Sequence, residues 1–202
     1  MTQLEISKQQ QREERKEQIL RAAATVFARK GLTNTKIADI AAEAGISHGL
    51  AYRYFASKED VFATLVEQAM NEAMHLAKTA LEHPGTPWNR LHWLTEQVLP
   101  KGQASSLPAY SLVVLHALTN EQIPPSVREM AARLGAITQE AVSRLITEGQ
   151  ATNQMMAGDP EQLALLYWAC IQGLIVGAIA PTIGEASFPD TNTVLRLFKA
   201  RP

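Results

Sequence analysis

The segment from residue 35 to residue 58 gathers side chains that bind phosphate, and they follow the spacing of two short helices. Hydroxyl, guanidinium and ammonium groups at such helix positions donate hydrogen bonds to phosphate oxygens, which fix the register of DNA without reading its sequence. The side chains of this kind are Ser47, Tyr52, Arg53, Tyr54 and Lys58. The chemistry that this segment predicts is therefore the binding of a polyanion.

Two helices of under three turns are not stable alone, so they must pack on each other and on the helix before them. Gly45 supplies the backbone angle of a tight turn between them. The small core that we expect there consists of Ile37, Ile40, Ala41, Ala44, Ile46, Ala51 and Phe55. The pattern predicts a helix-turn-helix, whose second helix directs its first turn, His48 to Leu50, into the DNA major groove.

Several fixed spacings around this segment resemble the DNA-binding domain of the TetR family of bacterial transcription regulators. They are Gly31, IADIAAEAGIS, YRYF, the SKE at residues 57–59, and upstream ILRAAATVFARKG. The resemblance implies a TetR-type domain over residues 13–73 with its helix-turn-helix at about 36–55. It also implies a helical effector-binding and dimerisation domain over residues 74–202.

The same resemblance assigns roles to single residues. It implies phosphate contacts for Lys36, Ser47, Tyr52, Tyr54 and Lys58, and it places His48, Gly49 and Leu50 nearest the base edges. Lys36 stands where the family often has a small hydroxyl residue, so the capping role is expected of Thr35. Leu50 stands where Thr is common, and it can contact only a thymine methyl. Each of Tyr52, Arg53, Tyr54 and His48 also has a plain alternative, as a core aromatic or a solvated side chain.

The rest of the chain reads as helix almost throughout, with no run of the period-two alternation typical of strands. The expected helices cover about 10–30, 35–44, 47–55, 57–81, 87–99, 110–118, 125–149, 159–180 and 191–200. Their starts are marked by Ser57, Thr86-Pro87 and Asp159-Pro160. The sequence therefore predicts an all-α fold of nine helices. The first dozen residues leave two alternatives open, disorder or contacts of Lys8, Arg12 and Arg15 with phosphates.

Small residues recur on one face of the helix expected at 159–180, where they allow another helix to approach closely. They are Ala169, Gly173, Gly177 and Ala180. Packing within the chain is the alternative. The resemblance implies that this helix and the last one, with Leu195 and Phe198, form a four-helix interface in a homodimer. Two recognition helices about 34–36 Å apart would then read a palindromic operator in double-stranded DNA.

The resemblance also implies a cavity for a small-molecule effector among the C-terminal helices. Aromatic walls with a few polar groups suit an apolar or aromatic ligand. The candidate lining residues are Trp88, Trp93, Tyr110, His116, Met130, Trp168, Cys170 and Gln172. For each of them a place in the core is the alternative.

Other classes of function find little support. The single cysteine, Cys170, excludes an intrachain disulfide and a cysteine-based zinc site, and the histidines lack metal-ligand spacing, so we expect no metal and no cofactor. No catalytic constellation is present, so we expect no enzyme. Leu163 to Ala180 carries no charge, but acidic flanks and Gln172 favour a buried helix over a membrane span. We expect a cytoplasmic protein.

The function predicted from these patterns is a dimeric, sequence-specific repressor that a small apolar or aromatic ligand releases from its operator. Two alternatives remain open. One is a DNA-binding regulator or activator that needs no ligand, and the other is an all-helical enzyme with an aromatic substrate cavity.

Overall fold

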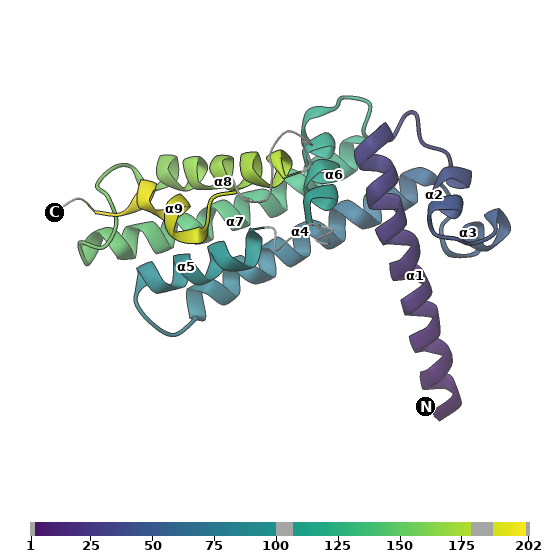
Figure 1. Ribbon diagram of the computed structural model, residues 1–202, viewed down its shortest axis with the longest axis horizontal. Coiled ribbons are helices and arrows are strands. Elements are labelled where there is room, and N and C mark those ends of the chain that lie inside the picture. The colour runs from purple at the N-terminus through teal and green to yellow at the C-terminus, as the bar shows by residue number, and fades with distance from the viewer. Residues whose placement is uncertain (1–2, 100–106, 179–187, 201–202) are drawn as a thin grey trace.

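The computed structural model describes residues 3–99, 107–178 and 188–200, and within them the chain is helical with only an isolated β-bridge (Figure 1). Its elements are α1 (Gln3–Lys30), α2 (Ile37–Glu43), α3 (His48–Tyr54), α4 (Lys58–Glu82), α5 (Pro87–Val98), α6 (Leu107–Thr119), α7 (Pro125–Ala151), α8 (Pro160–Gly177), α9 (Thr191–Leu195) and the 3-10 turn η2 (Arg196–Phe198). The predicted all-α class and the predicted order of nine helices are confirmed. None of the described helices is long and apolar enough to cross a membrane.

The helix starts that the sequence marked are built as expected. The Thr86 hydroxyl accepts the Asn89 N–H at 3.3 Å, and the Asp159 carboxylate accepts the N–H groups of Glu161 and Gln162. At the start of α4 the Ser57 hydroxyl accepts the Asp60 N–H at 3.1 Å. These bonds satisfy backbone donors that have no partner inside the helix.

The two ends of the chain differ from the prediction. α1 is helical from Gln3, which favours order over disorder for residues 3–12; residues 1 and 2 lie outside the described part of the chain. The last helix was predicted to reach Ala200, but α9 stops at Leu195 and the chain turns into η2. Lys199 then forms an antiparallel bridge with Met155, so backbone pairing with the α7–α8 loop ends the helix early.

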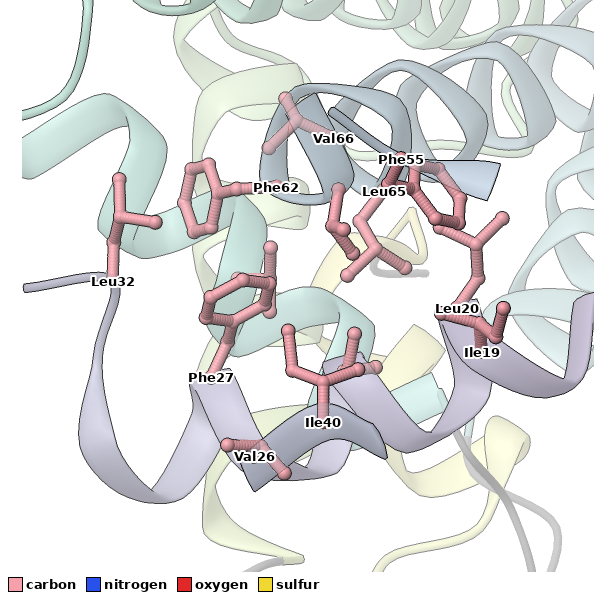
Figure 2. Packing of buried hydrophobic residues seen from close by; sticks show 14 of the residues in the cluster. Ile19, Leu20, Val26, Phe27, Leu32, Ile40, Phe55, Phe62, Leu65 and Val66 are labelled. Carbon is pink, nitrogen blue, oxygen red and sulfur yellow. The ribbon is translucent and has the colours of Figure 1, made fainter. Parts of the chain in front are cut away.

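One apolar cluster holds the N-terminal helices together (Figure 2). Phe27 of α1 meets Phe62 of α4 edge to face, with ring centroids 5.2 Å apart. Residues of α6 and the start of α7, including Val113 and Val127, belong to the same buried cluster. The core of the predicted 13–73 domain therefore continues into helices assigned to the second domain, and α4 runs unbroken through residue 73.

A second cluster joins α5, α7, α8 and α9. Tyr167 is fully buried in it, with its hydroxyl 3.1 Å from the Thr95 hydroxyl. Leu195 and Phe198 are buried in this same cluster, 0% and 1% exposed. The expectation that these two side chains face a second copy is wrong, because they already pack inside their own chain.

Candidate nucleic-acid interface and ligand cavity

The turn between α2 and α3 is fastened from both sides. Gly45 has φ 65°, a left-handed angle that suits glycine, and the Ile46 N–H donates to the Ala41 carbonyl at 3.0 Å. The Gln18 amide of α1 donates to the Ala44 carbonyl at 2.7 Å. α1 therefore holds the turn directly, in addition to its apolar contacts, and this fixes the orientation of α3.

The start of α2 is organised by an acid rather than by a hydroxyl. Asp39 accepts the Lys36 N–H at 2.8 Å and the Lys30 ammonium at 2.9 Å. The first of these bonds, and then the second, lowers the pKa of Asp39 below its usual value. Thr35 does not cap this helix as expected, because its buried hydroxyl donates to the Gly31 carbonyl at 2.6 Å. Its side chain is therefore unavailable to DNA, whereas Lys36 is exposed.

α3 presents a polar face to solvent. The Ser47 hydroxyl caps it by accepting the Leu50 N–H at 3.2 Å. The exposed residues are His48, Gly49, Tyr52 and Arg53. The Tyr52 ring is 50% exposed and meets the His48 ring edge to face, so it is not a core aromatic. Tyr54 is half-buried against the N-terminal core, and Leu50 is also half-buried.

Lys58 has a structural role that sequence reasoning missed. Its ammonium donates to the Leu32 carbonyl at 2.9 Å and to the Thr33 carbonyl at 3.0 Å. Both carbonyls lie in the turn that follows α1, so Lys58 ties this turn to the start of α4. The expected phosphate contact of Lys58 competes with two hydrogen bonds inside the chain.

A basic groove continues the α3 surface towards α1. Its walls are Lys8, Gln11, Arg12, Arg15, Leu50, Arg53 and Tyr54, around a space of about 550 Å³. The sequence left open whether Lys8, Arg12 and Arg15 contact phosphates or belong to a disordered segment. The helical extension of α1 places these three cations in one groove with residues of α3.

A cavity of about 1040 Å³ lies among the C-terminal helices, walled by α4, α6, α7 and α8 with the end of α5. Three predicted lining residues are there: Tyr110, Trp168 and Gln172. The Trp168 indole donates to the Thr138 carbonyl and the Gln172 amide to the Ser111 carbonyl, both at 3.3 Å. Burial raises the pKa of Tyr110 above its usual value, so its hydroxyl stays neutral.

The other five predicted lining residues lie outside this cavity. The Trp88 ring lies under the Lys199 ammonium, and Trp93 stacks on His83 with ring centroids 4.8 Å apart. Met130 packs on the N-terminal core. His116 and Cys170 lie on helices that do line the cavity, but at other positions of those helices.

The lining is less aromatic and richer in amides than expected. Sequence reasoning missed a set of polar side chains that face this space: Gln68, Asn71, Gln97 and Gln139. Amide side chains on helices usually read as solvated, so only the tertiary arrangement could reveal that they share one cavity.

One face of α8 is apolar and uncovered. Leu165 and Leu166 are 64% and 47% exposed, unusual values for leucine in a folded chain. Ala169 and Gly173 are exposed along the same helix, and a Cβ added at Gly173 would meet no atom within 4 Å. Gly177 is half-buried, and Ala180 lies outside the described residues. Ala169 also lines the cavity, so this face and the cavity adjoin.

A helix-turn-helix braced by a long first helix is an architecture that docks on double-stranded DNA. Residues 19–65 match the model for bacterial regulatory proteins of the tetR family. This part of the chain, with the helix-turn-helix inside it, is therefore similar to the DNA-binding domain of that family, as the resemblance implied.

Known proteins resemble different lengths of the chain. The uncharacterised HTH-type transcriptional regulator YfiR of Bacillus subtilis (strain 168) is 38% identical over 72 residues, which are 36% of this chain and 35% of that protein. The chain thus matches only about a third of this relative. The HTH-type transcriptional regulator BetI of Brucella canis (strain ATCC 23365 / NCTC 10854 / RM-666) is 24% identical over 155 residues, 76% of this chain and 78% of BetI.

Among solved structures, a Saccharomonospora viridis protein in complex with choline has the same fold. Its TM-score is 0.72 at 24% identity, and the match covers 94% of this chain and 100% of that one. The likeness therefore includes the C-terminal helices, for which the sequence alone offered only a matching helix order.

Replacing Lys58 by methionine separates its structural role from a DNA contact. Lys58→Met keeps most of the aliphatic stem and removes both bonds to the carbonyls of the turn after α1. We expect it to lower the free energy of unfolding by about 1 kcal/mol, below the usual worth of a charged hydrogen bond because the site is half-exposed. Urea unfolding measures this. Lys36→Met is the matched control and should change stability by less than about 0.5 kcal/mol. Equal stabilities of the two variants would contradict the structural role.

Proposed function

We propose that this protein is a homodimeric repressor that binds a palindromic operator in the cytoplasm and leaves it when a small, largely apolar ligand enters the C-terminal cavity. The observation that carries the DNA-binding part is the exposed polar face of α3. Among the described residues neither Lys36 nor Arg53 forms an ion pair, so both cations can neutralise phosphate without breaking an internal bond.

The residues of this face fall into two groups, those suited to contact phosphates and those suited to contact base edges. Lys36, Tyr52 and Arg53 carry donors suited to phosphate oxygens, which would orient the protein on any duplex. His48 and Gly49 form the exposed first turn of α3, the part that a helix-turn-helix directs to base edges. Leu50 is half-buried and lines the groove towards α1, whereas His48 is exposed. We therefore expect His48 to contribute more than Leu50 to base recognition.

The uncovered face of α8 supports the homodimer. Leucines at 165 and 166 would lose their exposed apolar area against a second copy, and the small residues Ala169 and Gly173 would let the two helices approach closely. A symmetric contact of this kind would also set the spacing of the two recognition helices.

α4 supports a mechanical link between ligand and DNA. Near its start, Phe62 and Leu65 belong to the core that carries the helix-turn-helix. Further along, a run from Gln68 to Leu76 lines the cavity. A ligand that prefers one tilt of α4 would therefore change the placement of α3. Shifting such an equilibrium from 1:99 to 99:1 requires a difference in binding free energy of about 5.5 kcal/mol.

The cavity lining favours a neutral or cationic ligand over an anion. Its titratable side chains include Glu72 and His75, both exposed, but no lysine or arginine. Tyr110 and Trp168 add aromatic faces, which attract a quaternary ammonium group. The bound choline of the Saccharomonospora viridis structure makes choline a sensible first probe, beside a neutral apolar dye.

The two alternatives have weaker support. A regulator that needs no ligand would gain nothing from an apolar cavity of about 1040 Å³. An enzyme would need paired reactive groups, and the lining consists mainly of aliphatic and amide side chains. The family match also argues for a regulator.

The DNA-binding proposal predicts a selected palindrome and a steep salt dependence. A random duplex pool selected with the full protein should yield a palindrome, and anisotropy titrations should show affinity falling sharply as salt rises. Tyr52→Phe keeps the ring contact with His48 and removes one hydroxyl, so it should weaken binding to all sequences by a similar factor, about fivefold. His48→Ala should instead alter the preference at one position of each half-site. An unchanged selection profile for His48→Ala would contradict this placement of α3.

The dimer proposal predicts that one charge on α8 separates the two copies. Leu166→Glu would place a carboxylate in the apolar contact, so sedimentation should show a monomer with an intact helical spectrum. Ala136→Glu, an exposed position of α7, is the matched control and should leave the dimer unchanged. A Leu166→Glu protein that remains dimeric would rule out this face.

The ligand proposal predicts that filling the cavity blocks the response. The neutral dye N-phenyl-1-naphthylamine should bind the wild-type protein with increased fluorescence, and it should release the selected palindrome if it prefers the free state. Gly135→Trp places a large ring in the cavity and should abolish dye binding. Ala132→Trp, on the exposed side of the same helix, should not. Equal dye binding by the two variants would mean that the dye binds elsewhere.

A further inference from the structure

The N-terminal half of α1 projects away from the body of the protein, past α2 and α3 (Figure 1). Side chains from residue 5 to residue 15 are exposed, and burial begins only around Lys16. Because these side chains are exposed, residues 5–15 of this extension contribute no apolar packing to the fold. Its chemistry lies in its charges.

The cations of this extension lie on one side, towards α3. Lys8, Arg12 and Arg15 line the basic groove, and Arg53 lines it from α3. In the described part of the chain, none of the four forms a salt bridge. Arg15 donates a hydrogen bond to the neutral Gln18 amide at 2.6 Å. The groove therefore holds four positive charges with no acidic side chain in its lining.

Three of the four acidic residues of this stretch face away from the groove. At about 100° per residue, Glu13, Glu14 and Glu17 fall more than a quarter turn away from the centre of the groove stripe. Two hydrogen bonds agree with this: Glu17 accepts the Gln68 amide of α4, and Glu13 accepts the Gln9 amide. Glu5 lies on the same side of α1 but one turn before Lys8, outside the groove lining. The sorting of charge by face explains why the net charge of the segment conceals a basic surface.

The groove is continuous with the recognition surface, because Leu50, Arg53 and Tyr54 of α3 form its other wall. DNA bound to α3 would therefore also lie next to the groove. We propose that the N-terminal half of α1 is a second DNA-binding element, which holds backbone phosphates flanking each half-site without reading their sequence. This inference rests on the DNA binding proposed above and adds a region of duplex that α3 itself cannot reach.

The length of the extension sets its reach. Residues 3–15 rise about 18 Å at 1.5 Å per residue. At 3.4 Å per base pair this corresponds to about five base pairs of flanking duplex. The cations Lys8, Arg12 and Arg15 are spaced along one stripe, so they can follow the backbone instead of meeting a single phosphate.

The test compares two duplexes that carry the palindrome selected by the wild-type protein. One ends at the palindrome and the other extends it by about six base pairs of mixed sequence on each side. The triple variant Lys8→Gln, Arg12→Gln, Arg15→Gln removes the α1 cations. The matched control Lys78→Gln, Arg133→Gln, Arg144→Gln removes the same number of exposed cations from α4 and α7. Thermal unfolding checks that both variants fold like the wild type.

The wild type and the control variant should bind the extended duplex at least about tenfold more tightly than the short one. Their plots of log affinity against log salt should be steeper on the extended duplex, by up to roughly 2.7 for each protomer, since each neutralised phosphate contributes about 0.9. The triple variant should bind both duplexes alike, with the shallow slope on each.

Three results would overturn this element. They are a wild type that is insensitive to flanking length, a triple variant that keeps the steep slope, and a control variant that loses it equally. Polyglutamate is tested beside the duplexes as a model of an acidic protein; a triple variant that binds both duplexes like the wild type but loses polyglutamate binding would assign the groove to an acidic protein partner instead. A wild type that selects no palindrome and binds neither duplex would refute the proposed function itself, a result distinct from the other four.

Discussion

The edge-to-face contact between Phe27 and Phe62 lies where α1 meets α4, and the DNA-binding region is assembled around this junction. α2 and α3 each have only seven residues, too few to be stable alone. They keep their positions because α1 and α4 supply the apolar surface on which they close. Gln18 and Lys58 then fasten the two adjoining turns through backbone carbonyls. The polar face of α3 is rigidly presented only because this junction is dry and closely packed.

The same junction prevents the two halves of the chain from being independent. α6 and the first turn of α7 complete the N-terminal core, and α4 belongs to both cores. A boundary at residue 73 therefore divides a continuous helix and a shared core. α4 forms one wall of the cavity, and it packs on α1, which lines the groove and supports α2 and α3. Such an arrangement suits a regulator, since a change at the cavity has a direct packed route to the DNA-binding surface.

Charge in this protein is organised by helix face. The first sixty residues contain slightly more basic than acidic side chains, which alone is weak support for binding DNA. In the folded chain three acids of α1 and α2 bind other parts of the chain: Glu17 accepts from Gln68, Asp39 pairs with Lys30, and Glu43 pairs with Arg29. The cations beside α3 keep no such partners in the described residues. The local field near α3 is therefore far more positive than the composition suggests.

Local sequence patterns were sufficient to predict the features that depend only on residues close together in the chain. The caps at Ser57, Thr86 and Asp159, the turn at Gly45 and the polar face of α3 follow from hydrogen bonds and periodicities spanning a few residues, so the sequence determined them. Tertiary packing decided what depends on distant segments. It turned Lys58 inward, buried Leu195 and Phe198, excluded Trp88 and Trp93 from the cavity and gathered amides from several helices around it. It also converted the cations of α1 into one wall of a basic groove, because only packing of residues 16–30 fixes the direction in which the helix projects beside α3.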